Sequence, residues 1–266
     1  MIRGAIMFKK YSIFIAALTA FLLVAGCSSN QSSTDSEKKV TLTISAAASA
    51  QDALEEIQKN YEKDHQHITI QDNYGSSGAL QKQISQGAGA DLFFSAAEDK
   101  FKKLVDDGDI AKKDSTELVG NEIVLVVPKN GDSPVTSFSN LAESEKIALG
   151  TPESVPAGAY GKESLTKLSL WDKVKDKIVY GKDVRQVLSY VETGNVDAGV
   201  VYKTDALVSK KVNIVDEAKA DTHSPIVYPL GIVKDTKHRK EAKEFYEYLQ
   251  SDEAMKVFEK YGFTAE

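Results

Sequence analysis

The stretch "DVRQVLSYVETGNVDAGVVYKTDA" (residues 183–206) contains the pattern that decides the fold prediction. Asp183 and Val184 stand before a segment whose apolar residues recur at helical spacing, which is typical of an amphipathic helix. The run "DAGVVY" (197–202) is short, apolar and β-branched, which is typical of a buried strand. A second helical pattern follows directly. The stretch therefore predicts helix, strand and helix in succession.

The same alternation runs through the rest of the chain. Short β-branched runs are separated by segments with apolar residues at helical spacing, such as residues 53–61. Regular alternation of strand and helix predicts an α/β fold with mainly parallel sheets. Two helical stretches, 238–250 and 251–263, close the chain. The expected strands are 40–46, 67–73, 91–96, 121–128, 146–150, 177–180, 197–202 and 226–233.

Two long apolar strands, 121–128 and 226–233, are each followed by a change in local character. We interpret them as the two connections between lobes, which makes the architecture discontinuous. Lobe one is then residues 40–120 plus 232–266, and lobe two is residues 121–231. In open α/β lobes, ligands bind beyond the carboxyl ends of the strands, where the following helices begin.

Residues 1–26 have the pattern of a signal peptide with a lipobox. Three cationic residues precede the apolar run "YSIFIAALTAFLLVAG" (11–26), which is short for a membrane span. The run ends at Cys27, the only cysteine, and its small residues resemble those that precede the lipidated cysteine of bacterial lipoproteins. We expect an exported protein, anchored by lipid on Cys27 to the outer face of the cytoplasmic membrane, with residues 27–39 as the lipidated cysteine and flexible tether. The alternative is an uncleaved anchor with an incidental cysteine.

Composition excludes some functions. The chain has 266 residues, of which 42% are apolar and 27% charged, as is ordinary for a globular protein. Loss of residues 1–26 leaves 30 cationic against 39 acidic residues, a formal net charge of −9. So acidic a chain is not expected to bind nucleic acid. The single cysteine allows no disulfide within the chain.

Five junctions between a strand and the following helix carry small or hydroxyl residues. The first backbone N–H groups of a helix have no partner within it, and the helix dipole adds positive potential there. Such groups, together with Ser and Tyr hydroxyls, bind anions without a formal charge. Converged in one cleft, the junctions suit a fully ionised dianion. They contain Ser49, Ser77, Ala157, Val184 and Tyr202.

An alternative interpretation is that Ser49 and Ser77 are ordinary helix N-caps, each contributing about 1 kcal/mol to its helix. Catalytic motifs give no competing site. "GSSGA" places Ala79 where a nucleophile elbow needs glycine, and "YGKES" lacks the glycine pattern of a phosphate-binding loop. The four histidines are scattered, and we interpret them as solvated surface residues. Arg185, which follows Asp183, is interpreted as part of a surface ion pair.

An ordered set of motifs carries a family resemblance. The segments "AAAS" (46–49), "YGSSGALQKQI" (74–84), "VPAGAYGKESL" (155–165), the stretch 183–206 and "FYEYLQSDEAMKVFEKYGF" (245–263) resemble the molybdate-binding (ModA) family of bacterial molybdate ABC transporters. The resemblance covers almost all of the chain after the tether. It implies a two-lobed, Venus-flytrap fold of the type II periplasmic-binding-protein class, with a tetrahedral oxyanion in the cleft between the lobes.

The resemblance also assigns roles by motif. Ser49 and Ser77 would give hydroxyl and backbone donors, Ala157 and Val184 a backbone N–H each, and Tyr202 its phenol. The implied ligand is molybdate, and with it tungstate, bound without a bare metal cation or a cofactor. The implied partner is an ABC permease with its ATPase, and the implied protein is a monomer and not an enzyme.

Two positions depart from the family pattern. Ala50 and Gly78 stand where family members commonly carry a leucine and a third serine, and we expect Gly78 to loosen the second helix start and shift affinity. Three alternative functions stay open. They are a receptor of the same fold for sulfate, phosphate or an organic anion, an exported serine hydrolase using Ser49 or Ser77, and a structural surface lipoprotein without a ligand.

Overall fold

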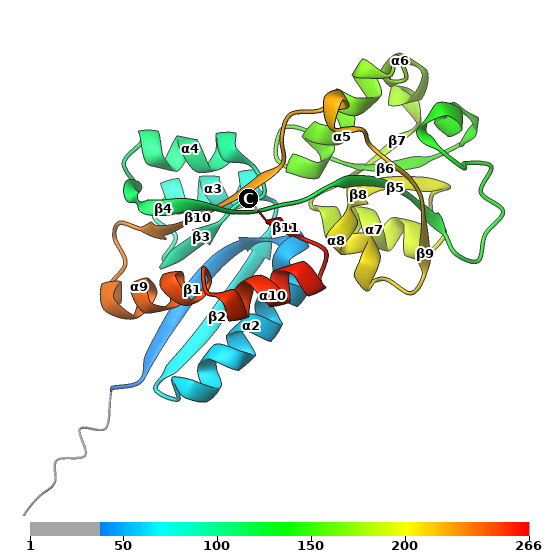
Figure 1. Ribbon diagram of the computed structural model, residues 1–266. Coiled ribbons are helices and arrows are strands. Elements are labelled where there is room, and N and C mark those ends of the chain that lie inside the picture. The colour runs from blue at the N-terminus through cyan, green and yellow to red at the C-terminus, as the bar shows by residue number, and fades with distance from the viewer. Residues whose placement is uncertain (1–37, 266) are drawn as a thin grey trace, which may run out of the picture. The chain divides into compact units, whose positions relative to one another are not determined.

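The computed structural model describes residues 38–265. The expected signal peptide, the lipidation site Cys27 and the tether up to residue 37 lie outside the described residues. Two β-sheets with helices packed on them make up the described part (Figure 1). The fold class is α/β, as the alternation of strand and helix patterns predicts. No helix between residues 38 and 265 combines the length and the apolar character needed to cross a membrane.

The first sheet has six strands in the order β11-β4-β10-β3-β1-β2. Strand β1 is parallel to β2 and β3, whereas β10 is antiparallel to β3 and β4, and β11 is antiparallel to β4. The strands are β1 (Val40–Ala47), β2 (Ile68–Gly75), β3 (Leu92–Phe94), β4 (Ile110–Gly120), β10 (Val227–Val233) and β11 (Thr264–Ala265). We call this sheet and its helices the first lobe. The helical elements are η1 (Ala48–Ala50), a single 3₁₀ turn, and α2 (Gln51–Asp64), α3 (Ser77–Ser85), α4 (Glu98–Asp106), α9 (Arg239–Tyr248) and α10 (Asp252–Lys260).

The second sheet has five strands in the order β7-β6-β8-β5-β9. Strand β6 is parallel to β7 and β8, and β5 is antiparallel to β8 and β9. The strands are β5 (Ile123–Pro128), β6 (Ile147–Gly150), β7 (Ile178–Gly181), β8 (Ala198–Tyr202) and β9 (Val212–Glu217). We call this sheet and its helices the second lobe. The helical elements are η2 (Phe138–Glu143), α5 (Pro156–Lys167), α6 (Trp171–Val174), η3 (Lys175–Lys177), α7 (Val184–Glu192) and α8 (Lys203–Val208), with η4 (Ala220–Thr222) on the path back to the first lobe.

Most strands run in one direction within each sheet, as expected, but both sheets are mixed because β5, β10 and β11 run the opposite way. The parallel strands β1, β2, β3, β6, β7 and β8 each lead into a helix by the usual crossover. Strands β5 and β10 instead enter their sheet directly from the other lobe. Because they begin at the end of the sheet where the parallel strands finish, they run in the opposite direction.

The chain passes between the sheets twice, through residues 121–122 and residues 218–226. The apolar strands interpreted as connections therefore begin just after the crossings, and each pairs within one sheet. Pairing of β10 places residues 227–231 in the first sheet, whereas the expected boundary assigned them to lobe two. The division into lobe one (40–120 plus 232–266) and lobe two (121–231) otherwise stays a prediction.

Helix α2 buries the apolar face that its sequence predicts. Ala53, Leu54, Ile57 and Tyr61 are all at most 1% exposed, and the helix lies against β2 and α10. Burial of a Leu or Ile side chain contributes about 1.5–3 kcal/mol. This packing fixes α2 and with it the η1 turn, which connects β1 to the helix.

Candidate functional site

A small cavity lies between the two lobes, at the junctions where α3, α5 and α7 begin. Its volume is about 10 Å³, roughly the space of one water molecule. The structure brings all five expected ligand residues to this one cavity. The lining residues are Ala47, Ala48, Ser49, Gly75, Ser76, Ser77, Ala96, Val155, Pro156, Ala157, Val184 and Tyr202.

The two serines do not cap their helices by side-chain hydrogen bonds, so the ordinary N-cap interpretation was wrong. Ser49 lies inside η1, and the N-cap of α2 is Ala50. Ser77 is the first residue of α3, after the N-cap Ser76. Both serines are buried, at 3% and 0% exposed respectively. Their hydroxyls are therefore directed to tertiary partners and to the cavity.

The Ser77 hydroxyl is held in a position that leaves its proton available. Its Oγ accepts a hydrogen bond from the Ala96 N–H at 2.9 Å. A hydroxyl donates one hydrogen bond and accepts up to two. With the acceptor side of Oγ occupied by Ala96, the Ser77 O–H remains as a donor for a ligand.

Ala157 and Val184 contribute backbone rather than side-chain donors. Ala157 is the second residue of α5, and Val184 is the first residue of α7, so neither N–H has a partner within its helix. Close packing holds α5 at this position, since a Cβ on Gly158 would lie 1.9 Å from the carbonyl oxygen of Gly150. Asp183 caps α7 by accepting from the Gln186 N–H at 2.8 Å.

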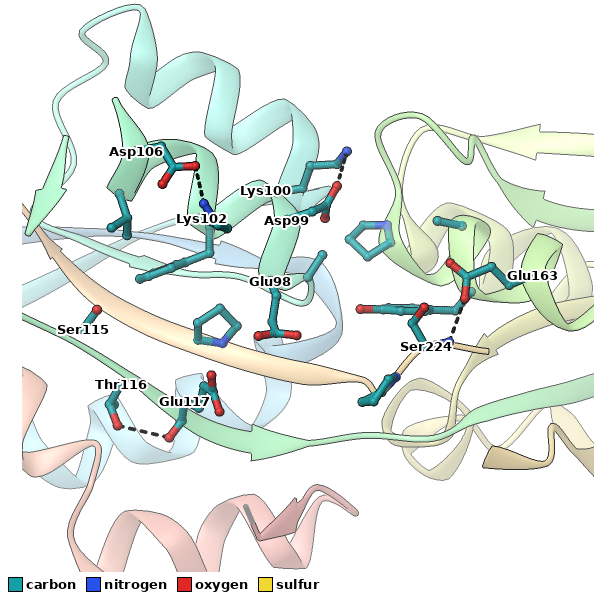
Figure 2. Close-up of a pocket in the computed structure, with 18 of the residues that line it drawn as sticks. Glu98, Asp99, Lys100, Lys102, Asp106, Ser115, Thr116, Glu117, Glu163 and Ser224 are labelled. Atoms are coloured by element: carbon teal, nitrogen blue, oxygen red, sulfur yellow. Dashed lines mark hydrogen bonds and ion pairs between the residues drawn. The ribbon is translucent and has the colours of Figure 1, made fainter. Parts of the chain in front are cut away.

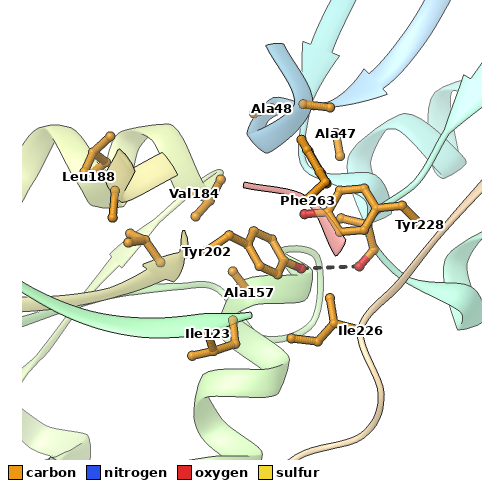
Figure 3. Close-up of a cluster of buried hydrophobic side chains, with 14 of the residues drawn as sticks. Ala47, Ala48, Ile123, Ala157, Val184, Leu188, Tyr202, Ile226, Tyr228 and Phe263 are labelled. Atoms are coloured by element: carbon orange, nitrogen blue, oxygen red, sulfur yellow. Dashed lines mark hydrogen bonds between the residues drawn. The ribbon is translucent and has the colours of Figure 1, made fainter. Parts of the chain in front are cut away.

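Tyr202 reaches the cavity from the end of β8 and contacts the other lobe. It is 1% exposed, and its hydroxyl donates to the carbonyl oxygen of Ala96 at 3.3 Å. Figure 3 also shows its hydroxyl bonded to that of Tyr228. Burial raises the pKa of Tyr202 well above its ordinary value, so the phenol stays a neutral donor.

The cavity lining contains no charged side chain. Its polar groups are hydroxyls and the N–H groups at the starts of α3, α5 and α7, whose dipoles add positive potential. Neutral donors of this kind bind an anion that carries no proton to donate. The arrangement therefore favours a fully ionised oxyanion over a carboxylic acid, a cation or an apolar ligand.

Arg185 does not form the simple surface pair that its sequence position indicates. Asp183 caps α7 instead, while the Arg185 guanidinium pairs with Asp52 at the start of α2 and with Asp205 on α8. The Arg185 Nε to Asp205 Oδ1 distance is 2.7 Å, and Asp205 is fully buried. Burial raises the pKa of Asp205 to about 6, while Arg185 opposes the shift. This ion pair links the two lobes beside the cavity.

Gly78 provides a further contact between the lobes. Its N–H donates to the carbonyl oxygen of Ser154 at 3.0 Å, which joins the first turn of α3 to the loop before α5. A Cβ at this position would lie 2.7 Å from that oxygen and 2.8 Å from the Ser154 Cα. The structure thus gives Gly78 a role in close approach of the lobes, and the looser helix start expected from sequence stays a prediction.

Two polar residues next to the cavity were missed in the sequence. The Tyr228 hydroxyl lies 2.8 Å from Ser49 Oγ, and the Asn121 Nδ2 lies 3.0 Å from the same hydroxyl. Both residues lie at the ends of the crossings between lobes. In the sequence, Tyr228 looks like one more apolar residue of the strand "IVYPLGIV". The only feature that could have marked it as a site residue is its phenol hydroxyl, because a hydroxyl within a buried strand needs a hydrogen-bond partner.

A much larger groove, of about 1120 Å³, lies between α4 and β4 of the first lobe and α5 of the second (Figure 2). Its charged residues are largely paired with one another or with backbone. Lys102 lies 2.5 Å from Asp106, Lys100 lies 2.9 Å from Asp99, and Glu163 accepts from the Ser224 N–H at 2.7 Å. Size alone therefore does not identify the site, because the groove lacks the convergent neutral donors of the small cavity.

Neither serine is arranged as a nucleophile. The side-chain partners of Ser49 and Ser77 are the Tyr228 hydroxyl and the Ala96 N–H, and neither is a general base. Two histidines pack against aromatic rings, His65 on Tyr61 and His223 on Tyr160. Within residues 38–265, no group of three His, Cys, Asp or Glu side chains is placed to hold a metal ion.

Two α/β lobes that are joined by two crossings and enclose a donor-lined cavity define a two-lobed solute-binding protein. The chain belongs to the family of bacterial extracellular solute-binding proteins, whose family model matches residues 42–264. Membership makes it an exported binding protein rather than an enzyme.

Individual relatives confirm the resemblance predicted from the ordered motifs. The molybdate-binding protein ModA of Haemophilus influenzae is 41% identical over 230 residues, which cover 84% of this chain and 90% of the relative. ModA of Escherichia coli K12 is 36% identical, covering 84% of this chain and 88% of the relative. The solved periplasmic molybdate-binding protein of Azotobacter vinelandii matches with a TM-score of 0.77 and 25% identity, over 85% of this chain and 99% of that one.

Proposed function

We propose that this protein captures molybdate, and with it tungstate, and delivers the ion to an ABC permease with its ATPase. The observation that carries the proposal is the convergence of Ser49, Ser77, Ala157, Val184 and Tyr202 on one cavity without a charged side chain. The names of the relatives supply the identity of the ion. The permease follows from the transporter context of the family resemblance.

Binding is coupled to movement of the lobes. The first lobe presents Ser49 and Ser77, and the second presents Ala157, Val184 and Tyr202. A cavity of about 10 Å³ has the room of about one water molecule, so the lobes must separate for a tetrahedral oxyanion to enter. Closure then brings both sets of donors onto the ion at once, and the ion stabilises the closed form because only that form offers all of them.

Selectivity follows from fit. Molybdate and tungstate are similar in size and larger than sulfate. A donor cage fitted to the larger ions leaves some donors too far from sulfate, and each unpaired buried donor costs on the order of 1–3 kcal/mol. The same argument disfavours phosphate, which also carries a proton near neutral pH and would place it against donors.

We further propose that the mature protein is a monomer anchored through lipid on Cys27, with residues 28–39 as the tether. Support comes from the apolar run that ends at a lone cysteine and from the extracellular character of the family. Cys27→Ala should move the protein from the membrane fraction to the soluble fraction of cells. Continued sedimentation with membranes would contradict the lipid anchor, and an unlipidated mature chain that elutes as a dimer would contradict the monomer.

Isothermal titration of the mature protein with molybdate, tungstate, sulfate and phosphate tests the function. We expect molybdate and tungstate to bind with similar affinity, and sulfate and phosphate at least tenfold more weakly. Molybdate at 100 times its dissociation constant should raise the free energy of unfolding by about 2.7 kcal/mol. Equal stabilisation by sulfate at the same concentration would indicate a sulfate receptor instead of a molybdate receptor. If none of the four ions has an effect, the protein is not an oxyanion receptor.

A further inference from the structure

Tyr228 occupies a position that the ligand assignment does not use. It lies on β10, directly after the second crossing between lobes, and its side chain is fully buried. Its ring packs against Phe94 and Phe263, with centroids 5.6 and 5.3 Å away. Its hydroxyl is aimed at the cavity residues Ser49 and Tyr202 (Figure 3). A phenol held so firmly at this point has a fixed hydrogen-bonding direction.

The direction is set by Asn121, in the first crossing. Asn121 Oδ1 accepts from the backbone N–H of Glu122 at 2.9 Å. A backbone N–H can only donate, so the atom that faces it must be the amide oxygen, and the amide orientation is fixed. The Nδ2 group then donates both of its hydrogens, one to Thr204 Oγ1 and one to the Tyr228 hydroxyl, each at 3.0 Å.

The hydrogen from Asn121 fixes what Tyr228 does with its own proton. The phenol oxygen accepts from Asn121, and its single proton is left to donate. Ser49 Oγ lies 2.8 Å away, a usual distance for a hydrogen bond between hydroxyls. The Tyr202 proton faces both the Ala96 carbonyl oxygen, at 3.3 Å, and the Tyr228 hydroxyl (Figure 3). The bond to Tyr228 raises the pKa of Tyr202, which means that Tyr202 is the donor in this pair. With Asn121 and Tyr202 both donating to the Tyr228 oxygen, Ser49 is the acceptor left for the Tyr228 proton.

We propose that Asn121 and Tyr228 form a hydrogen-bond relay that positions the Ser49 hydroxyl, so that its proton points into the cavity as a donor to the bound oxyanion. The relay rests on the proposed function. An oxyanion without a proton only accepts hydrogen bonds, so a Ser49 that spent its proton on Tyr228 would present a lone pair to the ion and repel it. Asn121 and Tyr228 are thus positioning residues that act through Ser49.

The relay also ties Ser49 to the path between the lobes. Asn121 lies in the first crossing, Tyr228 lies just after the second, and Thr204 is the second residue of α8 in the second lobe. The orientation of Ser49 in the first lobe is therefore set by groups that lie beside both crossings. A donor that is already oriented before the ion arrives costs less to order on binding.

Tyr228→Phe, which removes the hydroxyl and keeps the ring, tests the relay by titration with molybdate. We expect the dissociation constant to rise about 3- to 10-fold, since the donor is lost from the relay but Ser49 is retained. Tyr61→Phe is the matched control, because the Tyr61 hydroxyl is buried in the first lobe without a hydrogen-bond partner among residues 38–265. It should leave the dissociation constant unchanged.

A double-mutant cycle separates positioning from a general structural effect. In a Ser49→Ala background the relay has nothing to position, so adding Tyr228→Phe should change affinity by less than about 1.5-fold. Independent, additive losses from the two substitutions would overturn the relay. If Tyr228→Phe does not fold, Asn121→Ala tests the relay at the hydrogen bond before Tyr228. It should weaken molybdate binding in the wild-type background and change it by less than about 1.5-fold in the Ser49→Ala background.

The outcomes distinguish this inference from the proposed function. A wild-type protein that fails to bind molybdate removes both. A wild-type protein that binds molybdate and is weakened by Ser49→Ala, but is unaffected by Tyr228→Phe and by Asn121→Ala, keeps the function and removes the relay.

Discussion

Gly78→Ala should weaken oxyanion binding by holding the lobes apart. The added Cβ would meet the Ser154 carbonyl oxygen at 2.7 Å, the Ser154 Cα at 2.8 Å and its carbonyl carbon at 3.2 Å. All three are backbone atoms, so no side-chain rotation relieves the contact. The loop before α5 must move away from α3, and the 3.0 Å hydrogen bond from Gly78 N–H to Ser154 lengthens or breaks.

The magnitude follows from two costs that apply in the closed form. Loss of a neutral backbone hydrogen bond costs about 0.5–1.5 kcal/mol, and overpacking of a close contact costs about 1–3 kcal/mol. The two overlap, because the same movement relieves the clash and breaks the bond. A net penalty of about 1.5–3 kcal/mol raises the dissociation constant for molybdate roughly 10- to 150-fold. Gly78→Ser adds the same Cβ and should behave in the same direction.

Isothermal titration measures the loss of affinity, and thermal unfolding without ligand measures any general damage. We expect the ligand-free protein to open and to separate α3 from Ser154, so its melting temperature should shift by less than about 3 °C. Gly89→Ala is the matched control, since a Cβ at Gly89 meets no atom within 4 Å. Equal dissociation constants for Gly78→Ala and Gly89→Ala would refute the role of Gly78 in closure.

Three further predictions concern the donors and the ion pairs. Ser77→Ala should raise the dissociation constant for molybdate roughly 10- to 150-fold, because a hydrogen bond to a charged group contributes about 1.5–3 kcal/mol; titration that shows no change would remove Ser77 from the site. Arg185→Met should lower the free energy of unfolding by about 3–5 kcal/mol, because it leaves Asp205 buried and unpaired. Asp52→Asn, which removes only the partly exposed partner of Arg185, should lower it by at most about 1 kcal/mol. Equal losses of the two variants in urea unfolding would contradict this ranking. Burial raises the pKa of Tyr202 well above its ordinary value, so its neutral form persists as pH rises. The affinity for molybdate should therefore stay constant from pH 7 to 10 at fixed ionic strength. A loss of affinity with a midpoint near the ordinary tyrosine pKa of about 10 would show that the phenol is solvated.

Strong local patterns account for what could be predicted of the fold. The β-branched runs at 40–46 and 197–202 became β1 and β8, with boundaries that moved by one residue. The missed strands β4, β9 and β11 have a different character. The sequence of β9 mixes apolar and polar residues without strict alternation at a sheet edge, β11 has two residues, and the middle of β4 is polar and partly exposed. Such strands form because a neighbouring strand pairs with them, which their own sequence does not reveal.

The candidate site shows the same division between local and long-range information. Each expected ligand residue stands at a helix start that its own segment predicts, so the five junctions could be found one at a time. Tyr228 bonds to Ser49 across 179 positions of sequence and to Asn121 across 107, and only the fold brings these groups together. The partners of Arg185 could not be predicted for the same reason. Its carboxylates come from α2 and α8, and neither lies within its own helix.

A crystal structure of the protein with molybdate, with molybdenum located by its anomalous scattering, tests the central claim most directly. We predict a single molybdenum centre between the lobes. Its oxygens should lie within hydrogen-bonding distance of the Ser49, Ser77 and Tyr202 hydroxyls and of the Ala157 and Val184 N–H groups. A molybdenum centre in the larger groove beside Glu98 and Glu163, or one held by lysine side chains on the surface, would contradict the account.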